Sequence, residues 1–342
     1  MKIEVAIVSS TRDIARKANV SLATVSRILN NKPNVNASTR LLVLHVAQEL
    51  GYPIPDLARN MMVSRFVPVL IRQNANQLTQ TGRTGESFEQ TAWAGVEAVF
   101  AEKKVITKLQ FTSLTTESAE HFASEAGVAG LVVLGGVTPI DFLKRLKDLN
   151  MRFVIVGSHP HPLELNSVMA DVMTGMRLVV RHLLGKGRRR IGFVNGPNTT
   201  TTSEYKLDGV RLELGMCNIP FDTGALIASD FSPESGYLRT KELLARGLGL
   251  DAIMYADDMI AIGGMRALRE AGYRIPEDVA VTGFGDYDLS KFTSPTLTAV
   301  SYADMHAMGR IAATRLYQLL EGADPYPWSV LVPTSLVIRE SA

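Results

Sequence analysis

A ten-residue stretch near the N-terminus combines an amphipathic pattern with side chains suited to contacting another molecule. Residues 21–30 read SLATVSRILN, in which Val25, Ile28 and Leu29 recur at the spacing of one helical face. The other face carries short side chains and Arg27. Short side chains let a helix enter a groove, and an arginine can donate two hydrogen bonds to a guanine edge. The stretch predicts either a DNA-reading helix or an ordinary surface helix.

The residues before this stretch predict a partner helix. Ser10 is suited to cap a helix over residues 11–18, with Asp13 in its first turn. Asn19 tolerates the left-handed conformation, so a three-residue turn can lead into the next helix, which Ser21 is suited to cap. Two short helices joined in this way form a helix-turn-helix, whose second helix enters the major groove of DNA.

A third helical pattern follows. We expect Asn36 or Ser38 to cap it and the helix to end at Gly51, which suits the position after a helix end. Three helices of this size can close a small core. The residues that we expect at its centre are Ile14, Val25, Leu29 and Val43.

Charge is distributed unevenly along the chain. Residues 1–65 hold nine Lys and Arg against four Asp and Glu, a net charge of +5, and because the whole chain carries +2, the remainder carries −3. A basic N-terminal part is typical of nucleic-acid binding, since neutralising phosphates supplies most non-specific affinity.

Length and composition exclude several classes of protein. The 342 residues suggest two or three domains, and 46% apolar content is that of a globular protein with a sizeable core. No apolar run is long enough to span a bilayer and no signal peptide is evident, so we expect a cytoplasmic protein. The single cysteine, Cys217, excludes a disulfide or a thiolate metal cluster within one chain. We expect neither a metal, since His159 and His161 lack a third ligand, nor a dinucleotide cofactor.

From residue 66 on, short apolar runs alternate with helical patterns. Continuous Val, Ile and Leu runs are typical of buried parallel strands, and two cycles of the pattern predict two doubly wound lobes with a ligand cleft between them. The expected strands are 67–71, 130–134, 153–156, 191–194, 225–228, 252–255 and 279–284, and the expected helices are 89–102, 142–150, 173–184, 204–214, 234–246 and 259–271.

The N-terminal motifs resemble those of a known family. They read D-I-A-x-x-A-x-V-S-x-x-T-V-S-R-I-L-N, then T-R-x-x-V and A-x-x-L-G-Y, and they resemble the headpiece of the LacI/GalR family of bacterial repressors. Looser matches continue through A-D-D at 256–258 and I-P-E-D-V at 275–279. Among the subgroups, the chain is most similar to the evolved-β-galactosidase repressors.

The resemblance implies a domain layout. A helix-turn-helix headpiece would span residues 1–53, a hinge helix and linker 54–65, and an effector-binding and dimerisation domain 66–342. This last part would have the fold of periplasmic binding proteins, with three crossings between lobes. Lobe one would hold about 66–160 and 295–325, and lobe two about 161–292 and 328–340.

The same resemblance implies DNA contacts. Base edges would be read by Leu22, Ala23 and Arg27, and phosphates would be bound by Ser21, Thr24, Ser26 and Asn30. The hinge segment carries Arg59 and Met61 at the position where the family inserts a leucine into the minor groove. Apolar wedges between base steps include methionine.

The cleft residues are implied in part by the resemblance and in part by their places after predicted strands. Phe231 stands where the family has an aromatic residue that stacks on the effector, and Asp257 where it often has a contacting Asn or Asp. Lys206 replaces a frequent arginine. The family's hydroxyl-binding aspartate falls on Gly285, so the candidate here is Asp286, one residue later. Lobe one would contribute Arg72 and Gln73.

Simpler interpretations stand beside these. Phe231 would also suit a core position, Asp258 and Asp278 would suit helix caps, and the run Arg188 to Arg190 would suit a solvated surface. No arrangement of paired carboxylates or of Ser, His and Asp forms a convincing catalytic set, so we do not expect an enzyme.

Together these patterns predict a homodimeric repressor of a carbohydrate-utilisation operon. It would bind double-stranded operator DNA at the nucleoid and be released when a small sugar, expected to be a galactoside, binds between the lobes. Two alternatives stay open. One is a regulator that needs a corepressor, and the other is a sugar-binding receptor or enzyme without operator binding.

Overall fold

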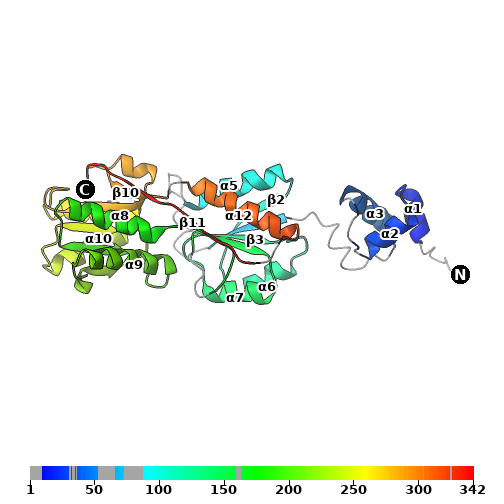
Figure 1. Cartoon of the computed structure of the whole chain (residues 1–342), viewed down its shortest axis with the longest axis horizontal. Coiled ribbons are helices and arrows are strands. Elements are labelled where there is room, and N and C mark those ends of the chain that lie inside the picture. Colours follow the sequence, from blue (N-terminus) through cyan, green and yellow to red (C-terminus); the bar gives the residue numbers. More distant parts are fainter. Residues whose placement is uncertain are drawn as a thin grey trace, which may run out of the picture. The chain divides into compact units, whose positions relative to one another are not determined.

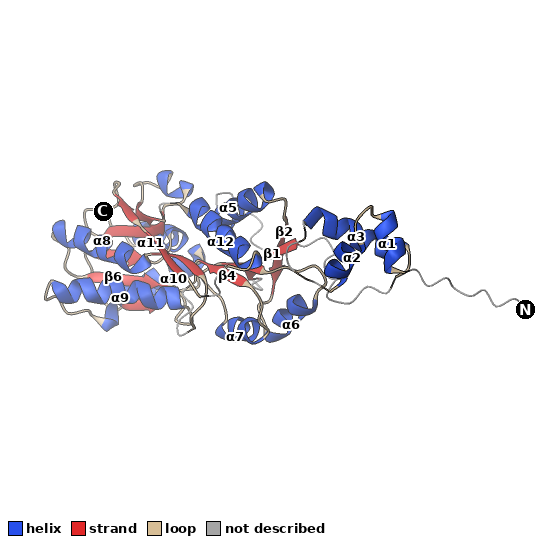
Figure 2. Cartoon of the chain, turned by 45° about the vertical axis from the view of Figure 1, so that its right-hand side comes forward, coloured by secondary structure: helices blue, strands red, loops and turns tan. Residues whose placement is uncertain are grey.

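The computed structural model describes residues 10–30, 32, 35, 37–52, 66–72, 88–158, 163–302, 304–323 and 326–342. These residues form two compact units, which we describe separately. One comprises Met1–Val67 with Ser124–Ala129, and the other Pro68–Ala123 with Gly130–Ala342. Figure 1 colours the chain along its sequence, and Figure 2 separates helices from strands.

The first unit contains three helices, α1 (Thr11–Lys17), α2 (Leu22–Leu29) and α3 (Ala37–Glu49). Both predicted caps are confirmed. Ser10 forms a reciprocal capping box with Asp13, and the Ser21 hydroxyl accepts from the backbone N–H of Thr24 at 3.1 Å. Because α3 begins at Ala37, Ser38 lies inside that helix and is not its cap, while Asn36 lies outside the described residues.

The turn and the core of this unit follow the sequence prediction. Asn19 has a φ of +52° and Gly51 a φ of +64°, so both adopt the left-handed conformation expected of them. All four predicted core residues are buried. The core cluster consists of Ile14, Ala18, Val25, Ile28, Leu29, Val43, Leu44, Val46 and Ala47. The three helices therefore hold one another through a shared apolar centre.

The second unit begins with a six-stranded sheet, the centre of lobe one. Its strand order is β11-β5-β4-β3-β1-β2, and the pairs that join β1 to β3, β3 to β4, β4 to β5 and β5 to β11 are parallel. The strands are β1 (Phe66–Arg72), β2 (Ile106–Thr112), β3 (Leu131–Leu134), β4 (Phe153–Val156), β5 (Ser167–Ala170) and β11 (Ser329–Val332).

Four helices cover the two faces of this sheet. Figures 1 and 2 show α5 (Phe88–Glu102) beside α12 (Met305–Leu320), with α6 (Thr116–Ser124) and α7 (Ile140–Asp148) on the opposite side. Helices α5 and α12 approach closely because a glycine on each faces the other backbone. A Cβ on Gly95 would lie 2.0 Å from the carbonyl oxygen of His306, and one on Gly309 would lie 1.9 Å from that of Ala92. Helix α12 thus belongs to lobe one and falls within the range 295–325 that was expected there.

Lobe two has a second six-stranded sheet with the order β12-β10-β9-β8-β6-β7. All pairs are parallel except that of β10 with β12. The strands are β6 (Ile191–Asn195), β7 (Leu226–Ala228), β8 (Ala252–Tyr255), β9 (Ala280–Gly285), β10 (Thr298–Ser301) and β12 (Ser335–Val337). The helices are α8 (Val172–Gly185), α9 (Thr201–Met216), α10 (Pro233–Ala245) and α11 (Asp258–Glu270), with short 3-10 turns η1 (Thr223–Ala225) and η2 (Asp288–Lys291).

The predicted lobe boundaries are wrong at three strands. We assigned β5 to lobe two, but it pairs with β4 of lobe one. We assigned β10 to lobe one, but it pairs with β9 of lobe two. The final segment was assigned wholly to lobe two, but β11 belongs to the first sheet and only β12 to the second. These strands have three or four residues and lie next to the crossings, so their sequence pattern does not show which sheet they join.

Besides β5, which was not expected as a strand, lobe one contains strand β2 and helix α6, which the sequence did not predict. Strand β2 lies at the edge of its sheet and alternates between exposed and half-buried residues, and α6 buries only Ala119 and Phe122. Neither has the continuous apolar run that marks the central strands. No helix in the described part of the chain combines the length and the apolar character needed to cross a membrane.

Candidate functional site

Helix α2 presents the side chains that the sequence assigned to DNA reading. Leu22 is 45% exposed, and Ala23, Ser26 and Arg27 are exposed, while Val25, Ile28 and Leu29 on the opposite face are buried in the core. Within the described residues, the Arg27 guanidinium makes no ion pair or hydrogen bond. The helix therefore offers an arginine and short neighbours on one accessible surface.

The four residues expected at phosphates are half-buried or exposed, and their polar groups bond to one another. The hydroxyls of Ser21 and Thr24 lie 2.8 Å apart, and Asn30 donates its amide to the carbonyl oxygen of Ser26 at 2.9 Å. Each group retains hydrogen-bonding capacity for a phosphate. The hinge residues Arg59 and Met61 lie outside the described residues.

The second candidate site is a cavity of about 570 Å³ in the other unit. Residues from both lobes line it, at the carboxyl ends of β1, β3 and β5 in lobe one and of β8 and β9 in lobe two. In doubly wound folds this edge of the sheet is where ligands bind. The volume falls in the range of small-molecule pockets.

Four of the six predicted effector residues line this cavity: Arg72, Lys206, Phe231 and Asp257. Gln73 lies outside the described residues. The structure corrects the prediction for Asp286, which is absent from the lining. Its carboxylate accepts from the guanidinium of Arg339 at 2.5 Å, and the residue has a φ of +55°.

Lys206, on α9, is buried to 98% in the wall of the cavity. Its ammonium donates to the carbonyl oxygen of Ala256 at 2.6 Å and lies 3.8 Å from the centre of the Phe284 ring. Burial lowers the pKa of Lys206 to about 8, and the carboxylates of Asp257 and Asp258 oppose this shift. An ammonium has three donors, so the group has capacity for a ligand oxygen.

Asp257 and Asp258 follow β8 and have different roles. The Asp257 carboxylate caps α11 by accepting from the backbone N–H of Met259 at 2.8 Å, and it faces the cavity. Asp258 was expected to be a cap, but it is fully buried and instead accepts from the backbone N–H of Tyr287 and the hydroxyl of Ser290. Burial and the neighbouring Asp257 raise the pKa of Asp258 to about 7.

Phe231 is half-buried at the cavity rather than part of the core. It has a φ of +68°, and its ring packs on Gly196, where a Cβ would lie 2.3 Å from the ring atom Cζ. A glycine at this position allows the ring to lie against the backbone. The ring can offer an aromatic face to the apolar side of a ligand.

Several lining residues were missed by sequence reasoning. Phe88 and Glu89 begin α5, whereas Tyr287 and Tyr302 follow β9 and β10. The Phe88 and Tyr302 rings lie 5.6 Å apart between centroids, and Tyr302 lies 5.2 Å from the Phe284 ring. The only signal for the two tyrosines was their place after a strand end.

Two surface predictions need comment. The run Arg188 to Arg190 is not simply solvated, because its guanidinium groups donate to the carbonyl oxygens of Pro276, Leu184 and Gly249. Asp278 was expected to cap a helix, but it precedes strand β9, and its carboxylate accepts from the backbone N–H of Arg274 at 2.8 Å. It pairs with Arg274 at 2.7 Å, and this hydrogen-bonded guanidinium lowers the pKa of Asp278 to about 2.

A helix-turn-helix unit with an exposed arginine, joined in one chain to a two-lobed unit with a polar and aromatic cavity, defines the class of ligand-responsive DNA-binding regulators. Comparison with known proteins narrows the class. Residues 10–56 match the lacI family of bacterial regulatory proteins, and residues 180–342 match a periplasmic binding protein-like domain.

Whole-chain relatives agree with these matches. The chain is 31% identical over 351 residues to the transcriptional regulator MalR of Streptomyces coelicolor, covering 96% of this chain and 95% of MalR. It is 27% identical to the transcriptional repressor CytR of Escherichia coli, covering 97% and 96%. The chain therefore belongs to the LacI family of transcriptional regulators, and its relatives are regulators rather than enzymes.

Solved structures share the fold over the whole chain. A complex of the regulator CelR with cellobiose superposes with a TM-score of 0.73 at 27% identity, covering 98% of this chain and all of CelR. The Lac repressor dimer bound to operator and an anti-inducer superposes with a TM-score of 0.70 at 24% identity, covering 98% and 99%. The predicted combination of headpiece and two-lobed body is thus confirmed.

Proposed function

We propose that this regulator is a homodimeric repressor of a carbohydrate-utilisation operon, released from its operator when a small sugar binds in the cavity. The observation that carries the DNA-binding part is the surface of α2, where Arg27 and short side chains are exposed on a helix whose other face is buried. Such a surface fits the major groove. We assign base contacts to Leu22, Ala23 and Arg27.

Phosphate contacts in this proposal come from the ends of α2. Ser21 and Thr24 lie at its start and Asn30 at its end, with Ser26 between them. Arg59 and Met61 of the hinge segment complete the proposed DNA contacts, with Met61 as the minor-groove wedge. Two copies of the chain would bind the two halves of a near-palindromic operator on the chromosome, because a two-fold protein matches a two-fold site.

The cavity supports a sugar as the effector. Phe231 supplies a face for the apolar side of a ring, while Arg72, Lys206 and Asp257 supply donors and acceptors for hydroxyls. Among the described residues of the lining, carboxylates outnumber cations, which favours an uncharged ligand over a sugar acid or phosphate. The lining carboxylates are Glu89, Asp230, Glu234 and Asp257, and the lining cations are Arg72 and Lys206.

A galactoside is the sugar that the subgroup resemblance implies, and the complex of CelR with cellobiose makes that disaccharide the second probe. In this proposal the sugar stabilises one arrangement of the lobes, and the paired hinge segments of the dimer then lose the register that fits DNA. Release follows only if the sugar binds more tightly to the state that fits the operator poorly.

A DNA-binding experiment tests the proposal. The full-length protein is used to select sequences from a random duplex library, and binding of the selected duplex is then measured at two salt concentrations. We expect enrichment of a near-palindrome and an affinity that falls as salt rises. Failure to enrich any sequence would contradict the proposal, as would a protein whose Arg27→Ala variant binds the selected duplex equally well.

A further inference from the structure

Gly285, the last residue of β9, leaves room for the ring of a neighbouring tyrosine. A Cβ at this position would lie 2.8, 2.9 and 3.2 Å from three ring atoms of Tyr287. Gly285 also has a φ of +134°, which side-chain-bearing residues rarely adopt. The chain therefore has no side chain at residue 285 and places the Tyr287 ring in that space.

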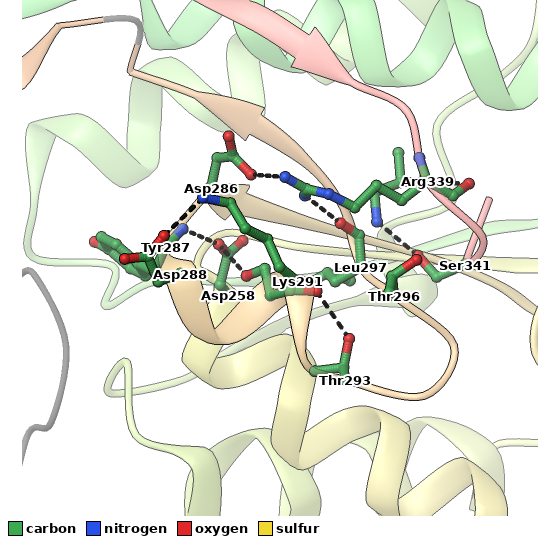
Figure 3. A network of polar contacts seen from close by, with 12 residues as sticks. Asp258, Asp286, Tyr287, Asp288, Lys291, Thr293, Thr296, Leu297, Arg339 and Ser341 are labelled. Carbon is green, nitrogen blue, oxygen red and sulfur yellow. Dashed lines mark hydrogen bonds and ion pairs between the residues drawn. The ribbon is translucent and has the colours of Figure 1, made fainter.

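Three anchors hold this tyrosine at the wall of the cavity, and Figure 3 shows the surrounding network. The backbone N–H of Tyr287 donates to Oδ2 of Asp258 at 2.9 Å, and the hydroxyl of Ser290 donates to the same oxygen at 2.7 Å. Asp286 is drawn to the opposite side by Arg339, which also donates to the carbonyl oxygen of Leu297. The segment is therefore fixed on both sides of Tyr287.

The phenol of Tyr287 faces a carboxylate of the same wall. Its oxygen lies 3.4 Å from Oδ2 of Asp257, and both residues line the cavity. This distance is long for a hydrogen bond between two oxygens, so the phenol is held only weakly by that contact. Removal of the phenol from water raises the pKa of Tyr287 well above its ordinary value, so its hydroxyl remains a donor.

This arrangement differs from the pattern that the family resemblance implied. Residue 285 is where the family's hydroxyl-binding aspartate was expected, and the side chain of Asp286 does not replace it. A carboxylate accepts hydrogen bonds only, whereas a phenol both donates and accepts and adds an aromatic face. The wall at this position therefore offers an uncharged group.

We propose that Tyr287 is a specificity-determining ligand contact of this protein, which uses its phenol with the Asp257 carboxylate to bind one hydroxyl of an uncharged sugar. The proposal rests on the function proposed above. The ring covers the C–H side of the sugar, and the phenol and carboxylate together take the hydroxyl. Because the anchors through Asp258 and Ser290 already fix the segment, ligand binding orders few further groups.

Calorimetric titration of the full-length protein tests this proposal, with methyl β-D-galactoside, lactose and cellobiose as the probes. We expect Tyr287→Phe to weaken binding of the best probe about tenfold, because the ring stays and the hydroxyl is lost. Tyr287→Ala should weaken it about a hundredfold, because the ring is lost as well. The matched control is Tyr273→Phe, a tyrosine of the same lobe that is 38% exposed and does not line the cavity.

The outcomes separate this proposal from the function on which it rests. Loss of affinity in both Tyr287 variants, with normal binding in Tyr273→Phe and unchanged binding to the selected DNA duplex, supports the contact. A probe that binds the parent protein and both Tyr287 variants equally overturns the contact and leaves the sugar effector intact. Absence of binding by all three probes to the parent protein overturns the sugar effector itself, and with it this contact.

Discussion

The exposed face of α2 and the cavity of the two-lobed unit differ in how their functional groups are held. On α2, Arg27 makes no side-chain interaction among the described residues, and the helix is positioned by apolar contacts on its other face. In the cavity, the side chains of Lys206 and Asp257 each have a hydrogen-bond partner before any ligand arrives, and Tyr287 is fixed through its backbone N–H to Asp258. The Arg27 side chain on α2 is thus free to adapt to a partner, whereas these cavity groups are already held in place.

This difference has a physical reason. A helix in the major groove must fit many phosphates and base edges of a large, hydrated partner, so exposed side chains can order on contact. A small ligand offers few contacts, so its site gains affinity by having its groups fixed beforehand. We therefore expect substitution of an exposed α2 side chain such as Arg27 to weaken DNA binding measured without sugar, and substitution of a cavity side chain to weaken sugar binding measured without DNA.

The largest expected effect is a loss of affinity for DNA. Arg27→Ala should weaken binding of the selected duplex about a hundredfold, the upper range for loss of a bidentate arginine contact to guanine. Sugar binding should stay the same. Fluorescence anisotropy with a labelled duplex measures the affinity for DNA, and calorimetry measures the affinity for the sugar. Arg239→Ala is the control, since this arginine pairs with Glu242 on an exposed helix of lobe two. Equal losses in both variants would show that α2 is not the reader.

The second largest expected effect is a loss of affinity for the sugar. Phe231→Ala should weaken binding of the best sugar probe about thirtyfold, because the aromatic face at the cavity is lost. Phe111→Ala is the matched control, as this ring is 62% exposed on the edge strand β2 and does not line the cavity. Calorimetry gives both affinities. Undiminished binding by Phe231→Ala would move the stacking role to another aromatic residue of the lining.

A third prediction concerns pH. Because burial raises the pKa of Asp258 to about 7, the folded state binds a proton more tightly than the unfolded state. Asp258 makes its whole contribution to the free energy of unfolding below its unfolded-state pKa, near 4. This contribution is lost as the pH rises through 7. Asp258→Asn removes the titration, so the melting temperature of the variant relative to the parent should rise by about 4 °C between pH 5 and 8.

Asp278→Asn is the control for this pH prediction. The pKa of Asp278 is lowered to about 2 by Arg274, so its contribution is present above the unfolded pKa and is lost only as pH falls toward 2. Its variant should therefore show a constant difference from the parent between pH 5 and 8. Scanning calorimetry measures all three proteins, and parallel curves for Asp258→Asn and the parent would exclude titration of Asp258 in this range.

The smallest expected effect is on the stability of α2, as distinct from its contacts with DNA. Ser21→Ala removes the N-cap bond to Thr24 and should reduce the stability of the headpiece by about 1 kcal/mol. Hydrogen exchange of the α2 amides in the full-length protein should show correspondingly faster opening. The control is Ser26→Ala, because among the described residues the exposed Ser26 hydroxyl accepts only from the Asn30 amide, at 3.4 Å, and makes no N-cap bond; it should leave exchange unchanged. Equal exchange in the two variants would contradict the capping role.

The helices of the headpiece could be predicted from the sequence because the residues that define them lie close together in the chain. The cap at Ser10, the turn at Asn19 and the buried positions of α2 all lie within twenty residues and follow helical spacing. The central strands were readable for the same reason, since each is a continuous apolar run. Short strands at the crossings, such as β5 and β11, were misassigned because pairing across the chain decides their sheet.

The cavity was only partly readable because its residues come from distant segments. Lys206, Phe231 and Asp257 were found from the family pattern and their places after strands, and the structure places them in one wall. The prediction for Asp286 was wrong because its carboxylate pairs with Arg339, which lies 53 residues later in the chain. The backbone N–H of Tyr287 is held by Asp258, 29 residues earlier, and no local pattern indicates that Tyr287 lines the cavity.

The central claim is that the cavity and the DNA-reading helix belong to one regulator, so that a ligand in the first changes binding by the second. The most direct measurement is the affinity of the full-length protein for its selected duplex, with and without a saturating concentration of the best sugar probe. The account predicts that the sugar weakens DNA binding about tenfold or more, within the usual range of coupling between two sites. An affinity for DNA that stays the same when the sugar fills the cavity would contradict it.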